Sequence, residues 1–333
     1  MLETIMARMR GRRSIAVGAL FLLAVLASAL GACSSGSSLR EPASPGPYGV
    51  GIAHMTFTRA SSTTGLPRVL DTVIWYPVDD EGNGEPVADA PPATKGAPFP
   101  VVLFSHGSGG EPDHASYLTE HLASWGFVVV APAHPGNTQQ DGNCDVECLA
   151  DSFINRGPDV IFTLDQVLAL KDDESQSLGA IIDAQRAAVT GFSFGGMTAV
   201  RAAPEGRFDA IAGLAPAAPE ALIEIGRALD VPILVAAGGG DIAVPSDQVQ
   251  RFYEALPGGI PRYYLYFPRA THTSFQNECQ EGCELSQERA HELINRYVTA
   301  FLEAYVIRDG RYLRYLEQGE PPDVELRAGG TAR

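Results

Sequence analysis

Residues 189–196 read VTGFSFGG, and this stretch decides the fold because it joins a short apolar run to a helical pattern through Gly-x-Ser-x-Gly. A serine in this pattern lies on a sharp, strained turn between a strand and a helix, so the residues two positions away must be small. Gly191 and Gly195 meet that requirement around Ser193. The bare pattern is also compatible with an ordinary Gly-rich connection, so its weight depends on the surrounding sequence.

Apolar runs typical of buried strands alternate with helical patterns along the rest of the chain. The segments FPVVLFS, FVVVA and ILVAA are continuous apolar runs, as expected for strands buried on both faces of a sheet. The alternation predicts an α/β fold with a mostly parallel central sheet and helices on both faces. Two further strand patterns, at 48–58 and 69–76, predict an antiparallel pair at the N-terminal edge.

Composition and charge narrow the domain organisation and the partners. No internal repeat divides the sequence, so we predict a single folded domain over residues 48–318 and a flexible tail over 319–333. The 333 residues include 24 Lys and Arg against 40 Asp and Glu, a formal net charge of −16. This balance argues against nucleic acid as a partner, because phosphate binding requires clustered cations.

Two later loops supply the residues that a nucleophilic serine needs. A serine nucleophile requires a histidine base and a carboxylate that orients it, and in this topology both follow later strands, with the acid first. Asp241 follows the strand pattern ILVAA, and His272 follows YYLYF. We therefore predict Ser193 as nucleophile, His272 as general base and Asp241 as the orienting acid. Asp247 is the alternative acid, although it falls within a predicted helix.

A tetrahedral intermediate also needs two backbone N–H donors. The residue after the nucleophile, Phe194, supplies the first, and the Gly-rich loop at 105–110 is expected to supply the second. His106 lies in that loop, but it precedes the nucleophile in the chain. We therefore predict a structural role for His106 and not that of a base.

The segments GFSFGG, FSHGSGG, WGFVVVAPAHPGNT and THTSF resemble α/β-hydrolases of the group containing platelet-activating-factor acetylhydrolases and predicted dienelactone hydrolases. They are also similar to bacterial polyester hydrolases and cutinases. The resemblance covers roughly residues 48–305 and implies the α/β-hydrolase fold, the same Ser-Asp-His assignment, and Ser108 as the second oxyanion amide. Dienelactone hydrolases use a cysteine nucleophile where this chain has Ser193, which argues against that activity. Residues 155–159 resemble an Arg-Pro-x-Asp segment of the group, and Arg156 is expected to tie the preceding long loop to its helix.

The N-terminus has the pattern of an export signal. Four arginines precede an apolar run at 15–30, and a basic segment followed by an apolar one is typical of a secretory signal. The sequence LGAC at 30–33 resembles a bacterial lipobox, which implies cleavage after residue 32 and lipid on Cys33. An ordinary cleaved signal is the alternative. With a Ser- and Pro-rich tether at 33–47, the pattern predicts an exported protein anchored to a bacterial membrane, either periplasmic or at the cell surface.

The remaining cysteines form two Cys-x-x-x-Cys pairs, Cys144 with Cys148 and Cys279 with Cys283. In an exported protein an even number of cysteines predicts disulfides, and four allow three connectivities, which the sequence leaves open. A zinc site is the rival interpretation, but export favours oxidation, and we predict no metal. Both pairs are expected near the rim of the active site, since they follow carboxyl ends of parallel strands.

These observations predict a serine carboxylic-ester hydrolase that acts through an acyl-enzyme, without a cofactor or an obligate protein partner. Only about sixteen residues separate the strand patterns ending at 214 and beginning at 231, so no large cap is expected and the site should be open. Short-chain or extended esters, including polymers, are the expected substrates. A thioesterase, a lipase and an acyltransferase share this machinery, and a binding lipoprotein without activity is the alternative from another class.

Overall fold

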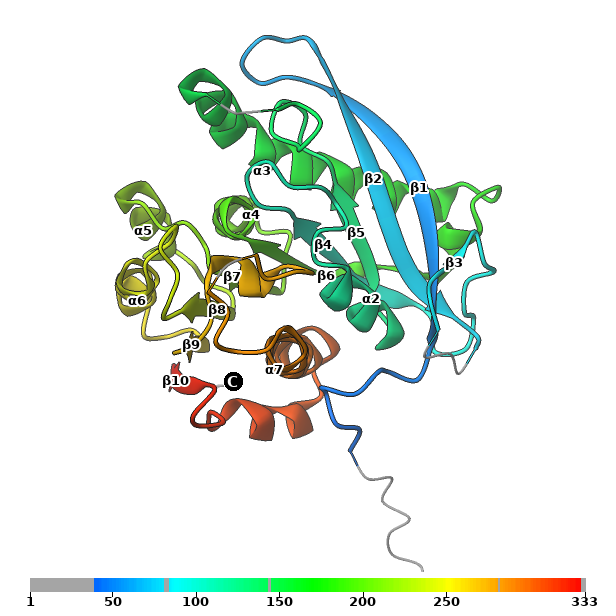
Figure 1. Cartoon of the computed structure of the whole chain (residues 1–333). Helices are drawn as coiled ribbons and strands as arrows, with labels where there is room; N and C mark the ends of the chain where they lie inside the picture. The colour runs from blue at the N-terminus through cyan, green and yellow to red at the C-terminus, as the bar shows by residue number, and fades with distance from the viewer. Residues whose placement is uncertain (1–38, 81–83, 143–144, 281, 331–333) are drawn as a thin grey trace, which may run out of the picture. The chain divides into compact units, whose positions relative to one another are not determined.

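The computed structural model describes residues 39–80, 84–142, 145–280 and 282–330, and its folded unit begins at Glu41. Within these ranges a ten-stranded sheet has the order β10-β9-β8-β7-β6-β4-β5-β2-β1-β3 (Figure 1). The strands are β1 (Gly49–Ala60), β2 (Pro67–Val78), β3 (Val87–Ala88), β4 (Phe99–Ser105), β5 (Val128–Pro132), β6 (Ile182–Phe192), β7 (Ala210–Leu214), β8 (Ile233–Gly238), β9 (Arg262–Phe267) and β10 (Glu325–Gly329).

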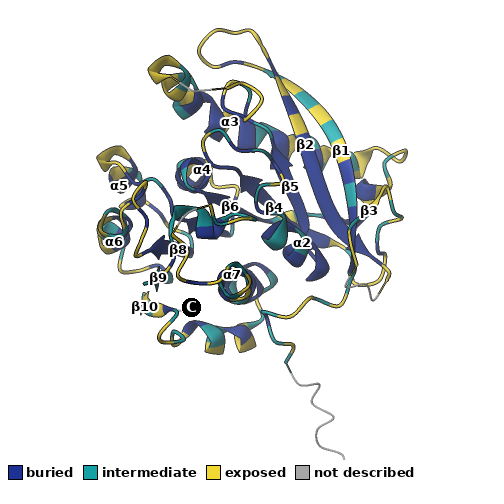
Figure 2. Cartoon of the chain, in the orientation of Figure 1, coloured by how far each residue is buried: buried dark blue, intermediate teal, exposed yellow. Residues whose placement is uncertain are grey.

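The sheet is parallel in the middle and antiparallel on both sides of it, and the two-residue β3 at one end pairs with β1 in parallel. Strands β4 to β9 pair in parallel, with β5 beside β4. Strand β2 joins β5 in antiparallel pairing, and β1 extends the edge from β2. Every residue of β4, β5, β7 and β8 is buried, which explains their continuous apolar sequences (Figure 2). The predicted α/β class and its antiparallel N-terminal edge are confirmed.

Helices cover both faces of the sheet (Figure 1). One layer contains α2 and α7, which contact each other, and the other contains α3, α4, α5 and α6 packed in sequence. These helices are α2 (Ser116–Ser124), α3 (Val146–Ala169), α4 (Phe194–Ala202), α5 (Glu220–Gly226), α6 (Ser246–Ala255) and α7 (Gln287–Leu302). Helix α3 begins at Val146, where Asp145 caps it by accepting a hydrogen bond from the Cys148 amide. Part of the long loop expected before Arg156 is therefore helical.

Both ends of the predicted domain differ from expectation. The prediction of a flexible tail over 319–333 is wrong for β10, whose residues pair with β9 and complete the far edge of the sheet. The predicted tether over 33–47 is wrong from Glu41 onward, because this segment packs on the C-terminal end of α2. There the His121 ring bonds Pro42 O at 2.8 Å and the Trp125 indole donates to Ser44 O at 2.9 Å.

The predicted signal at 1–32 and the predicted lipidation site Cys33 lie outside the described residues. Among the described helices, none combines the length and the apolar character needed to cross a membrane.

Candidate active site

Ser193 lies on a strained turn between β6 and α4. Its backbone has φ 56° and ψ −118°, a conformation that side chains rarely adopt. The turn is possible because its neighbours are glycines: a Cβ on Gly195 would lie 1.8 Å from Ser105 O, and one on Gly191 would lie 2.5 Å from the Gly195 carbonyl carbon. The Ser193 amide donates to Leu214 O at 2.8 Å, which fixes the turn against β7.

The structure brings Ser193, His272 and Asp241 together from three loops at the carboxyl ends of parallel strands. His272 Nε2 lies 2.9 Å from Ser193 Oγ, and His272 Nδ1 lies 2.7 Å from Asp241 Oδ2. The His272 side chain is 19% exposed, so the group that faces substrate remains accessible. The distances match those of a nucleophile, its base and an orienting acid.

Asp241 is held so that one oxygen remains for the histidine. Its other oxygen, Oδ1, accepts hydrogen bonds from the amides of Ala243 at 2.9 Å and Val244 at 2.7 Å. The alternative acid, Asp247, does not reach His272. It lies in α6 with 71% of its side chain exposed, and it pairs with Arg251.

The loop after β4 lies against Ser193, as expected for the second half of an oxyanion hole. A Cβ on Gly107 would lie 2.9 Å from the Phe192 ring and 3.6 Å from Ser193 Cβ, so a side chain there would fill the space beside the nucleophile. Ser108 follows and is exposed, with its hydroxyl accepting a hydrogen bond from Asn137 Nδ2 at 3.0 Å. Phe194 begins α4, where the first amides of a helix have no partner within it.

Residues 82–328, most of the chain, match a protein family described as PET hydrolase-like. The chain belongs to the PET hydrolase-like family.

Curated relatives are cutinases and a terephthalate ester hydrolase. The chain is 29% identical to the cutinase est1 of Thermobifida alba over 222 residues, which are 66% of this chain and 65% of that protein. It is 26% identical to cutinase 1 of Thermobifida cellulosilytica over 278 residues, covering 83% of this chain and 87% of the relative. A bis(hydroxyethyl) terephthalate hydrolase of Streptomyces coelicolor is 25% identical over 227 residues, or 68% and 63% of the two chains. The chain thus spans slightly less than two thirds of the length of several relatives.

Behind the oxyanion loop, this PET hydrolase-like chain buries a second serine, histidine and aspartate in line. Ser105 Oγ lies 2.9 Å from His134 Nε2, and His134 Nδ1 lies 3.1 Å from Asp159 Oδ2. All three side chains are inaccessible, so this line cannot meet a substrate. The sequence carries no signal for this line, because its three residues come from β4, from the loop after β5 and from α3, and no local motif links them.

Asp159 is an ionised anchor for the N-terminal edge of the sheet. Arg59 Nε and Arg68 Nη2 contact its two carboxylate oxygens at 2.6 and 2.8 Å. Burial acts to raise the pKa of Asp159, but hydrogen bonds from His134 and Arg68 outweigh it and hold that pKa well below its usual range. The cluster therefore fastens α3 to the hairpin of β1 and β2.

Both histidines near this cluster are neutral. Burial, followed by the charge of Arg156, lowers the pKa of His134 to about 3 and the pKa of His106 well below its ordinary value. The His134 amide donates to His106 Nε2 at 3.2 Å, so the His106 proton is on Nδ1, which lies 2.7 Å from Gly107 O. His106 thus shapes the oxyanion loop, in agreement with the structural role predicted for it.

Cys279 and Cys283 form a disulfide within their own loop. Of the three connectivities, those that join either cysteine to another loop are therefore excluded. Thr271 Oγ1 lies 3.3 Å from Cys279 Sγ, and the Gln280 amide donates to Thr273 Oγ1 at 3.0 Å. The bridge therefore packs on both residues that flank His272. Cys144, the other cysteine of the Cys148 pair, lies outside the described residues. No cluster of potential metal ligands occurs in the part of the chain that the structure describes.

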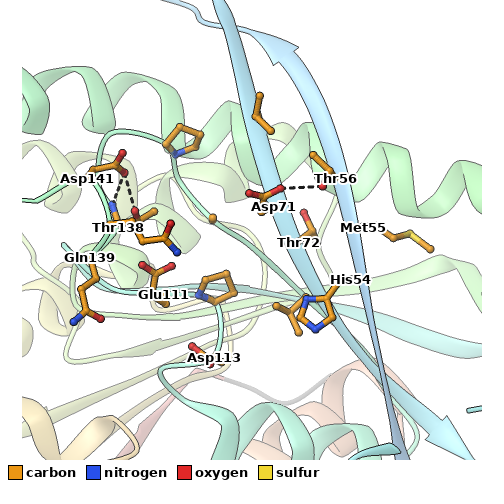
Figure 3. Close-up of a pocket in the computed structure, with 16 residues that line it drawn as sticks. His54, Met55, Thr56, Asp71, Thr72, Glu111, Asp113, Thr138, Gln139 and Asp141 are labelled. Atoms are coloured by element: carbon orange, nitrogen blue, oxygen red, sulfur yellow. Dashed lines mark hydrogen bonds between the residues drawn. The ribbon is translucent and has the colours of Figure 1, made fainter. Parts of the chain in front are cut away.

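A cavity of about 660 Å³ adjoins the oxyanion loop on the side of β1 and β2 (Figure 3). Glu111 and Asp113 come from the segment that follows Ser108, and Asp141 comes from the loop that follows Asn137, whose side chain bonds Ser108. Asp71 adds a fourth carboxylate from β2. The triad does not line this cavity, but its acidic wall begins at Glu111, the residue directly after the oxyanion loop.

Proposed function

We propose that this chain is a serine carboxylic-ester hydrolase that acts on neutral short-chain or polymeric esters. The observation that carries the proposal is the continuous line Asp241–His272–Ser193, with the serine on a strained turn at the start of α4. Membership of the PET hydrolase-like family and similarity to cutinases support the same reaction class.

The chemistry follows from the positions of these atoms. Ser193 Oγ forms a bond to the ester carbonyl carbon while His272 Nε2 takes its proton, and the carbonyl electron pair moves onto oxygen. The amides of Phe194 and Ser108 stabilise that oxyanion. The intermediate collapses, and the alcohol leaves with the proton from His272. Water, deprotonated by His272, then attacks the acyl-enzyme and releases the acid and Ser193.

The acidic cavity predicts discrimination against anionic substrates. We expect kcat/KM for bis(2-hydroxyethyl) terephthalate, which is neutral, to exceed that for the mono(2-hydroxyethyl) ester by about tenfold at low salt, because a carboxylate near four others is repelled. High salt should narrow the ratio, since exposed charges are screened over about 8–10 Å at physiological ionic strength.

The matched variant for this prediction is the double substitution Glu111→Gln and Asp113→Asn, which removes two charges near the oxyanion loop. The ratio should fall toward the value of about two that the number of ester bonds alone gives. A ratio that is equal at low and high salt and in the variant would contradict the charge argument.

We also propose that the mature chain is attached to a bacterial membrane through lipid on Cys33. The support is the sequence alone: the basic segment, the apolar run at 15–30 and the LGAC sequence that ends it. Mass spectrometry of the protein purified from bacterial membranes should find an N-terminal diacylated Cys33, and Cys33→Ser should release it to the soluble fraction. An unmodified N-terminus at another residue contradicts the lipid anchor.

A further inference from the structure

Arg156 is a fully buried cation that reaches the oxyanion loop from α3. Its guanidinium donates to His106 O, and Nη1 lies 3.2 Å from Asn137 Oδ1. The guanidinium carbon lies 4.8 Å from the centre of the Phe194 ring. These contacts include the predicted tie between the long loop and its helix, and they extend beyond it.

The contacts of Arg156 join both halves of the proposed oxyanion hole. Phe194 carries one of the two donating amides, and its ring packs on the guanidinium. His106 O and Asn137 connect the guanidinium to the other half, because Asn137 Nδ2 donates to the Ser108 hydroxyl at 3.0 Å. A shift of Arg156 would therefore move both amides relative to each other.

The charge of Arg156 is not neutralised by a bonded carboxylate. Among the described residues, its hydrogen-bond acceptors are a backbone carbonyl and an amide oxygen. His106 Nδ1 lies 3.3 Å from Nη2, but this nitrogen carries the histidine proton and does not accept. Asp159 is close enough to act on it through space, but its oxygens are bonded to Arg59, Arg68 and His134. Burial lowers the pKa of the Arg156 guanidinium to about 9, which leaves it cationic at neutral pH.

We propose that Arg156 is a positioning residue for the oxyanion hole, which aligns the Phe194 and Ser108 amides and places a buried positive charge behind them. Burying a cation without a bonded anion is costly, and the tetrahedral intermediate supplies the complementary negative charge during the reaction. The proposal deepens the proposed function and rests on it. In this role Arg156 stabilises the negatively charged intermediate more than it stabilises the bound neutral ester.

The test separates binding of the ester from stabilisation of the intermediate. Arg156→Met should lower kcat for p-nitrophenyl acetate by about 10- to 100-fold with KM changed less than threefold, a smaller loss than removal of an oxyanion donor itself. The inhibition constant of a phenylboronic acid, which forms a negatively charged tetrahedral adduct on serine, should rise in parallel. Arg156→Lys keeps the charge, and its kcat should be at least threefold higher than that of Arg156→Met.

Arg68→Met is the matched control, since Arg68 is a second buried arginine. Among the described residues its hydrogen bonds go to Asp159 and Asp151, and none reaches the oxyanion loop. Its kcat should stay within threefold of wild type at a temperature where both variants are folded. Equal losses of kcat in the Arg68 and Arg156 variants, or an unchanged boronate constant in Arg156→Met, would overturn the proposal.

Asn137→Ala keeps the proposal testable if both Arg156 variants fail to fold. It cuts the link to Ser108 and should lower kcat about threefold to tenfold with little change in KM. Wild-type kcat in that variant contradicts the positioning role. If the wild-type protein neither hydrolyses the ester nor binds the boronate, the proposed function itself fails, a result distinct from any difference between variants.

Discussion

Replacing Ser193 with Ala is expected to lower kcat for ester hydrolysis by about 10³-fold or more, because no other group lies in position to attack the carbonyl carbon. The melting temperature should change little. The substitution removes one hydroxyl, whose hydrogen bond is to the partly exposed His272, and alanine adopts the positive φ of the turn at a cost similar to serine. Steady-state kinetics and a thermal melt on the same preparation measure both effects.

An exposed serine provides the control. Ser175→Ala removes a hydroxyl that bonds Asp173 outside the site, and it should keep wild-type kcat. Hydrolysis by Ser193→Ala within tenfold of wild type, in a preparation free of other esterases, contradicts the assignment of the nucleophile.

Asp241→Asn should lower kcat by about 10³- to 10⁴-fold while the fold is kept. The carboxylate accepts from His272 Nδ1 and so fixes the proton there, which leaves Nε2 free to take the Ser193 proton. A neutral amide cannot stabilise the imidazolium that forms, and its NH₂ group can favour the wrong tautomer. The kinetic constants of the variant at saturating ester measure this loss.

Asp247→Asn tests the alternative acid with the same chemical change. Because Asp247 is exposed on α6 and pairs with Arg251, the variant should retain kcat within about twofold of wild type. The opposite pattern, an inactive Asp247 variant beside an active Asp241 variant, contradicts the acid assignment.

The central residues were predictable because their signals are local. The Gly-x-Ser-x-Gly pattern that marks Ser193 spans only five residues, and continuous apolar runs mark the strands before Asp241 and His272. Chain order and strand position then sufficed to select Asp241 over Asp247. The structure adds the distances that bring these residues into one line.

The parts that escaped prediction depend on contacts between distant segments. Arg59 and Arg68 lie 100 and 91 positions before Asp159, and their ion pairs with it have no pattern in the sequence. Strand β10 forms by pairing with the free edge of β9, which no local pattern indicates. The start of α3 depends on one capping residue, Asp145. A Ser-Pro-Gly composition suggested a tether where Pro42 and Ser44 instead accept hydrogen bonds from α2 and the residue after it.

The most direct measurement is covalent labelling of the folded protein with a fluorophosphonate probe, followed by peptide mapping. The assigned triad predicts one labelled residue, Ser193. Labelling should be lost in Ser193→Ala and strongly slowed in His272→Ala, because the probe reacts with a serine whose proton His272 removes. Absence of labelling in the active-site peptide of the wild-type protein, or equal labelling in the Ser193→Ala variant, would contradict this assignment.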